Sequence, residues 1–162
     1  MSEQHIVGIS DRKVASAPDV IATYALGSCV GVALYDEASK IGGLAHIMLP
    51  DSGMVSDGAV NRMKFADTGV TDLVADMVSR GARRGMLTAK IAGGANMFRL
   101  SDDSLIASIG DRNVERVKAA LDKLGINIIA EDVGKDYGRT LFFDLATGNV
   151  NVQSLGKSAK EI

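Results

Sequence analysis

The chain has little of what several protein classes depend on. Its 162 residues include one cysteine, two prolines and no tryptophan, and aromatic residues amount to 4%. A single cysteine cannot form an internal disulfide, so nothing indicates an oxidising compartment. Because aromatic side chains are few, the core must be built mainly from Val, Ile, Leu, Ala and Met.

Long apolar runs and a strongly charged face are also missing. The longest apolar runs are far shorter than the roughly 18 residues that a membrane helix needs. The start, MSEQHIVGISDRK, has no apolar segment of the secretory type. The formal net charge of −2 gives no basic surface for nucleic acid. We therefore expect a cytoplasmic protein without membrane insertion or nucleic acid, and a monomer because no extended apolar stripe is visible.

The sequence reads as one domain. No repeat or linker interrupts residues 1–155, and 46% hydrophobic residues suffice for a proper core. The segment 156–162, GKSAKEI, is small, charged and aperiodic, and we expect it to be a flexible tail.

Strand patterns dominate the first half. In residues 30–35, Val30, Val32 and Leu34 alternate with Gly31, Ala33 and Tyr35, which predicts a strand with one small-residue face that allows close approach. A polar turn separates it from a second strand over 41–48, and antiparallel pairing of the two is the simplest arrangement. Further strands are predicted at 6–9, 13–15, 20–24, 86–92, 126–133, 140–145 and 150–153.

Two segments have helical periodicity. Val70, Leu73, Val74, Met77 and Val78 predict an amphipathic helix that starts near Asn61 and stops at Gly81. A second helix carries Val114, Val117, Leu121 and Leu124, with Asp111 or Asn113 as its cap and Gly125 at its end. The prediction is an α+β fold of mixed α/β layers, with two main helices against a sheet.

The single cysteine, Cys29, stands between Gly27-Ser28 and Gly31. A lone cysteine is most often an inert small residue of a core. Nearby glycines, however, allow a sharp turn and the approach of a substrate, and an intracellular chain with one Cys and few His fits a nucleophile with a distant base. The residues alone leave both interpretations open.

His46 lies in an otherwise apolar strand, where it is either a core histidine or a functional partner. If the strands 30–35 and 41–48 pair antiparallel, the ends that carry Cys29 and His46 meet. A neighbouring imidazolium can lower the pKa of a thiol from its usual value near ~8.5 by several units. A third group should orient the imidazole, and Thr23 is the nearest candidate, although composition cannot select it from the other hydroxyl residues. One Cys without CxxC or HxxxH leaves too few ligands for structural zinc, so we expect no metal.

The motifs around these residues resemble one family. TYALGSCVGVALYD (23–36) and GGLAHIMLP (42–50) are similar to the CheD family of bacterial chemotaxis proteins, which deamidate glutamines of chemoreceptors. The similarity continues in NRMKFAD (61–67), KIAGGANMF (90–98), IGDRNVE (109–115) and GRTLFFDLATGNV (138–150). It covers nearly the whole chain.

The resemblance implies a sheet-rich cysteine hydrolase fold shared with the cytotoxic necrotizing factor toxins. It makes Cys29 the nucleophile, His46 the general base and acid, and Thr23 the residue that orients the imidazole. The reaction expected is hydrolysis of a glutamine side chain to glutamate with release of ammonia, without a cofactor. Backbone N–H groups near Gly27, Ser28 and Cys29 are candidates for binding the oxyanion.

Substrate and partners follow from the same resemblance. A receptor helix needs a shallow groove beside the thiol, and we expect Gly27, Gly31, Gly42 and Gly43 to form it, although each glycine can equally serve a turn or bulge. The alternative is a regulatory binding protein for a CheC-type phosphatase, with little or no catalysis. A degenerate copy kept for binding alone is disfavoured because Thr23, Cys29 and His46 are all present. Met97 and Phe98 form an apolar pair that we interpret as core filling rather than a partner contact.

Overall fold

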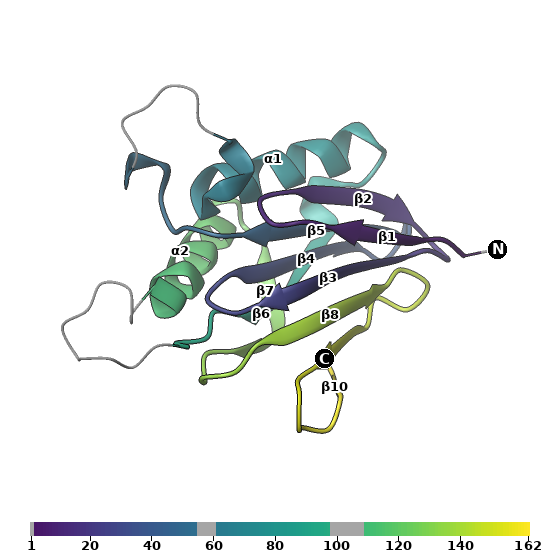
Figure 1. Cartoon of the computed structure of the whole chain (residues 1–162). Helices are drawn as coiled ribbons and strands as arrows, with labels where there is room; N and C mark the ends of the chain where they lie inside the picture. The colour runs from purple at the N-terminus through teal and green to yellow at the C-terminus, as the bar shows by residue number, and fades with distance from the viewer. Residues whose placement is uncertain (1, 55–60, 98–108) are drawn as a thin grey trace.

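The computed structural model describes residues 2–54, 61–97 and 109–162, and Figure 1 shows their arrangement. The strands are β1 (Gln4–Val7), β2 (Arg12–Ser16), β3 (Val20–Leu26), β4 (Val30–Asp36), β5 (Ile41–Ile47), β6 (Leu87–Gly93), β7 (Asn127–Val133), β8 (Arg139–Asp144), β9 (Val150–Gln153) and β10 (Lys160–Glu161). The helices are α1 (Ala66–Ser79) and α2 (Ile109–Lys123), with short 3-10 turns η1 (Ser52–Met54), η2 (Arg62–Lys64) and η3 (Arg84–Met86).

The strands form two five-stranded sheets that pack face to face. The first sheet has the order β1-β3-β8-β9-β10 and the second the order β2-β5-β4-β6-β7. Pairing is antiparallel except for β1 with β3 and β6 with β7. Both helices cover the outer face of the second sheet, which gives three layers (Figure 1). The α+β prediction with two main helices is confirmed, but the helices pack against only one of two sheets.

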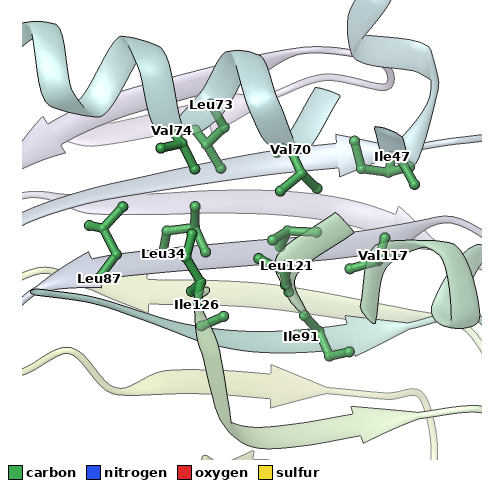
Figure 2. Packing of buried hydrophobic residues seen from close by; sticks show 14 of the residues in the cluster. Leu34, Ile47, Val70, Leu73, Val74, Leu87, Ile91, Val117, Leu121 and Ile126 are labelled. Carbon is green, nitrogen blue, oxygen red and sulfur yellow. The ribbon is translucent and has the colours of Figure 1, made fainter. Parts of the chain in front are cut away.

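The central strand β4 explains the layering. It pairs antiparallel with β5, as predicted, and every residue in it is buried. Val30, Val32 and Leu34 face the helices, while Ala33 and Tyr35 face the other sheet. The small-residue face of the sequence is therefore the contact between sheets. Figure 2 shows the packing of the helix side, which is built from Leu34, Ile47, Val70, Leu73, Val74, Leu87, Ile91, Val117, Leu121 and Ile126.

The helix ends follow the sequence signals only in part. Gly81 and Gly125 have φ of 108° and 72° and lie just beyond α1 and α2, as predicted for C-terminal stops. Asn61 caps the short turn η2 through Met63 N, and α1 itself begins later, at Ala66. The prediction of Asp111 or Asn113 as the cap of α2 is wrong, because the helix already includes Ile109. No helix among the described residues has the length and apolar composition needed to cross a membrane.

The end of the chain has a position in the sheet. Within the segment 156–162, expected to be a flexible tail, β10 pairs with β9, and the main chains of Ile162 and Val150 exchange two hydrogen bonds. The Lys90 ammonium also donates to the Ile162 carbonyl at 2.8 Å. Main-chain pairing therefore joins the last three residues of this segment to β9.

Candidate active site

The loop of Gly27, Ser28 and Cys29 carries the chain from the first sheet to the second. It joins the end of β3 to the start of β4. Its carbonyls are held by a neighbouring loop, because Ala95 N donates to Gly27 O and Gly94 N donates to Cys29 O, each at 2.8 Å. A Cβ at Gly93 would lie 2.3 Å from Cys29 O, so a glycine is required there. The position of the cysteine is thus fixed by main-chain contacts on both sides.

His46 lies on the face of β5 that is turned to the first sheet, and its side chain is fully buried. Its direct partner across the ladder is Gly31, and the ladder ends one residue later at Val30 and Ile47. Cys29 is two residues before Gly31, half-buried, and packs against the cluster between the sheets. Cys29 and His46 therefore both lie on the side of the second sheet that faces the first, next to the end of the β4–β5 ladder.

Thr23 of β3 completes the arrangement from the opposite sheet. Its Oγ1 lies 2.7 Å from His46 Nδ1 and 2.8 Å from Val7 O. The hydroxyl has one proton, and a carbonyl only accepts, so Thr23 donates to Val7. It must then accept from Nδ1–H of His46. The proton sits on Nδ1, and Nε2 keeps its lone pair.

Nε2 of His46 is buried and has no hydrogen-bond partner within residues 2–54, 61–97 and 109–162. A buried acceptor without a donor is costly in free energy and is rare in folded proteins. An imidazole nitrogen that keeps an open lone pair can act as a general base for a thiol.

Burial sets the protonation of both groups. It raises the pKa of the Cys29 thiol, and it lowers the pKa of His46 from 6.5 to about 4. At neutral pH the thiol and the imidazole are thus both neutral. The expectation that an imidazolium holds the thiol as thiolate is reversed in this environment, because desolvation penalises both charged forms.

The backbone donors around the cysteine differ from one another. Gly27 N–H donates to Ala25 O at 3.1 Å, which occupies it in a tight turn. The N–H groups of Ser28 and Cys29 make no hydrogen bond to any described residue. Of the candidates for an oxyanion site, Ser28 and Cys29 therefore have donors to offer, and Gly27 does not.

The glycines expected to line a substrate groove lie in the interior. A Cβ at Gly42 would sit 2.3 Å from Leu145 Cδ2, and one at Gly43 would sit 2.8 Å from Leu73 Cδ1. Both are near the end of β5 remote from His46, where the layers approach closely, so their prediction as groove residues is wrong. Gly31 is also buried, with Leu141 and Leu26 at 3.1 and 3.2 Å from an added Cβ. Gly31 thus faces packed leucine side chains and not an open groove.

An open hollow begins beside the cysteine loop. It is lined by Ala25, Met97, the stretch from Tyr137 to Thr140, and the stretch from Gln153 to Leu155. Met97 lies 3.6 Å from the position of a Cβ on Gly27 and is 45% exposed. Its interpretation as core filling is wrong for this residue, and Phe98 lies outside the described residues.

The described residues that could together hold a metal ion lie outside this arrangement. Among the described residues, the one group of carboxylate and imidazole ligands close enough for a metal is Glu3, His5 and Asp19. There His5 Nε2 already contacts Asp19 Oδ2 at 2.9 Å. Cys29 and His46 belong to no such group within the part of the chain that the structure describes.

One buried polar residue of the site was missed at the sequence level. Asn113 of α2 is fully buried, and its Nδ2 donates to Ser28 O and Met48 O. A signal for it existed, because Asn113 precedes Val117 and Leu121 at intervals of four on the apolar stripe of the helix. A polar residue in such a stripe indicates a buried hydrogen-bonding role rather than a cap.

Comparison with known proteins identifies the family. Residues 48–154 match the family model described as "CheD chemotactic sensory transduction". The "Probable chemoreceptor glutamine deamidase CheD" of Moorella thermoacetica is 52% identical over 157 residues, covering 96% of this chain and 93% of the relative. The protein of the same name from Clostridium botulinum is 51% identical, covering 96% of both chains. A solved structure, the Bacillus licheniformis hypothetical protein YfiH, is 18% identical with a TM-score of 0.48, covering 75% of this chain and 49% of that one.

Proposed function

The chain belongs to the CheD family, and on this basis we propose that it hydrolyses glutamine side chains of chemoreceptors to glutamate. The observation that carries the proposal is the Thr23–His46 hydrogen bond, which leaves the Nε2 lone pair open on the face where Cys29 lies. Cys29 is the nucleophile, His46 the general base and acid, and Thr23 the orienting residue.

The first step is acylation of the cysteine. As Cys29 Sγ bonds to the side-chain carboxamide carbon, the thiol proton passes to His46 Nε2. The neutral resting pair favours this concerted transfer, because a free thiolate would be poorly solvated in the half-buried loop. Throughout this step His46 Nδ1–H keeps donating to Thr23 Oγ1, and this hydrogen bond stabilises the imidazolium that forms.

The developing oxyanion needs preorganised donors. The N–H groups of Ser28 and Cys29 suit this role, since they are not engaged with any described residue. The loop that carries them is held in place by the bonds from Ala95 and Gly94. Donors fixed in this way need no reorganisation when charge develops.

Release of ammonia and of the product completes the cycle. His46 Nε2–H gives its proton to the amide nitrogen, so that ammonia leaves and a thioester remains on Cys29. A water molecule then loses a proton to Nε2 and attacks the thioester carbonyl, and Cys29 recovers its proton. The receptor side chain becomes glutamate. A glutamyl methyl ester has an easier leaving group, and hydrolysis of such esters stays a prediction.

We place the receptor helix in the hollow lined by Ala25, Met97 and Leu155. The hollow is open to solvent, as a helical protein substrate requires, and it lies next to the cysteine loop, because Met97 in its lining is 3.6 Å from the position of a Cβ on Gly27. Leu155 and Met97 expose 101% and 45% of their surface and offer apolar contact. The reaction takes place in the cytoplasm, with the enzyme acting as a monomer.

A receptor cytoplasmic fragment tests the proposal. Incubation with the purified protein should add about 1 Da at individual glutamines, since –NH₂ is replaced by –OH. Cys29→Ala and His46→Ala should abolish this change, and Thr71→Val, on the exposed surface of α1, should leave it intact. Undiminished deamidation by Cys29→Ala would refute the assignment.

Binding of a CheC-type phosphatase is the second role, and it is independent of catalysis. Calorimetric titration of the Cys29→Ala variant with such a phosphatase separates the two, because this variant retains its surface. Lack of measurable heat would leave hydrolysis as the only role.

A further inference from the structure

Asn113 is the one neutral polar side chain of α2 that is fully buried. Its Nδ2 donates to Ser28 O at 2.9 Å and to Met48 O at 3.0 Å. Ser28 immediately precedes the nucleophile, and Met48 follows the base by two residues. One amide group from the helix layer thus joins the two chain segments that carry the reacting side chains.

The contact lies where β4 and β5 separate. Their ladder ends at Val30 and Ile47, so no rung joins Cys29 to Met48. From there Met48 N donates to Lys64 O, while Cys29 O accepts from Gly94 N. The two main chains therefore bond to different neighbours beyond Val30 and Ile47 and separate there. We call this separation of Ser28-Cys29 from Met48 the fork.

The chemistry of the fork requires a double donor. Ser28 O and Met48 O are both acceptors, so they cannot bond to each other. A primary amide offers two N–H groups on one nitrogen without bringing a charge into the interior, and it faces both carbonyls. The opposite orientation of the amide would place Oδ1 against two carbonyl oxygens. These contacts therefore fix the orientation of Asn113.

We propose that Asn113 is a positioning residue, whose amide replaces the missing rung and holds the Cys29 thiol in register with His46 Nε2. It acts through the main chain of Ser28 and Met48 and touches neither substrate nor reacting atoms. The proposal rests on the Cys29–His46 chemistry of the proposed function. Without the amide, the fork widens and the thiol moves relative to its base.

The pH dependence of cysteine acylation tests this without a receptor. Single-turnover acylation of Cys29 by p-nitrophenyl acetate, followed by p-nitrophenol release, should reach a plateau above about pH 5 in the native protein, because His46 is then an unprotonated base. Asn113→Ala should lower the plateau by about 100-fold, as misplacement of a catalytic group does. Its rate should then rise about tenfold per pH unit, as for an unassisted thiol.

Val117→Ala is the matched control. Val117 lies one turn further along α2, is fully buried and packs only in the helix–sheet core. It should lower the thermal midpoint at least as much as Asn113→Ala and keep the plateau. Asn113→Asp retains the shape of the side chain but presents oxygens to the two carbonyls, so the rate should also lose its plateau in this variant. If the alanine variant does not fold, the aspartate variant provides the test.

The outcomes separate this proposal from the deamidase assignment. A plateau in Asn113→Ala or Asn113→Asp within about threefold of the native one would overturn the positioning role, as would an equal loss in Val117→Ala. A native plateau that depends on Asn113, combined with no deamidation of a receptor fragment, would refute the proposed substrate and leave the positioning role standing.

Discussion

Thr23 and His46 are joined across the two sheets by a hydrogen bond of 2.7 Å, in which the threonine accepts and the imidazole donates. The direction follows from the second bond of Thr23, whose proton goes to Val7 O. The main-chain carbonyl of β1 thereby determines the tautomer of a histidine on β5. In the proposed mechanism, β1 therefore affects catalysis through a main-chain carbonyl alone.

The threonine hydroxyl should be essential, and its methyl group should not. Thr23→Val retains the shape but cannot accept from Nδ1–H, and we expect deamidation to fall by about 100-fold or more, as when a triad loses its orienting member. Thr23→Ser should stay within about tenfold of the native rate. Rates measured on a receptor fragment decide this.

Thr71 is the control for that substitution. Its hydroxyl also donates to a main-chain carbonyl, Asp67 O at 2.9 Å, but Thr71 lies at an exposed position of α1. Thr71→Val should keep full activity. Equal rates for Thr23→Val and the native protein would contradict the orienting role.

Deamidation should depend on pH through His46. Because burial lowers its pKa to about 4, the imidazole is a competent base from about pH 5 upward, and activity should fall only below that. A profile of kcat/KM between pH 3.5 and 8 checks this. An acid limb centred near 6.5 would show a solvated imidazole and contradict the burial of the pair.

The same burial makes stability depend on pH. The folded state holds His46 with a pKa depressed from 6.5 to about 4, so unfolding takes up a proton in this range. Stability should be complete above about pH 6.5 and fall by on the order of 3 kcal/mol as the pH drops to 4.

Urea unfolding of a His5→Gln background isolates this contribution, because His5 is the other histidine. Adding His46→Gln should remove the extra loss of stability between pH 6.5 and 4. An identical slope with and without His46 would show that its pKa is not depressed.

Gly42 should be needed for packing and not for catalysis. Gly42→Ala places a Cβ 2.3 Å from Leu145 Cδ2 and should destabilise the fold by about 1–3 kcal/mol. Gly85→Ala meets no atom within 4 Å and is the control. Thermal unfolding measures the difference. In the folded Gly42→Ala variant, p-nitrophenyl acetate should acylate Cys29 at the native rate. A loss of that rate without a loss of folding would indicate that Gly42 does line the substrate groove.

The strands and helices followed from local pattern, since the alternation of Val30, Val32 and Leu34 and the period of Val70, Leu73 and Met77 are local properties. The division into two sheets did not. A small-residue face such as that of Gly31 and Ala33 accommodates a ligand or a second sheet equally well. For the same reason Gly42 and Gly43 were misread, because tight turns, close layers and open grooves all favour glycine.

The residues proposed for catalysis could be predicted from the sequence, and the groups that surround them could not. Cys29, His46 and Thr23 were predicted from motifs, and the antiparallel pairing of β4 with β5 was predicted from the pattern of these strands. Val7 contributes a main-chain carbonyl and Asn113 a side-chain amide that binds two main-chain carbonyls, and such partners depend on tertiary packing. Burial of His46, which reverses the expected protonation, likewise arises from the contact between sheets rather than from neighbouring residues.

The ring nitrogens of His46 give the most direct measurement. In protein labelled with ¹⁵N-histidine, the ring shifts should report a neutral imidazole protonated at Nδ1, unchanged from pH 8 to pH 5, with the thiol of Cys29 unionised. An imidazolium at pH 7, or a proton on Nε2, would contradict the arrangement of Thr23, His46 and Cys29 described above.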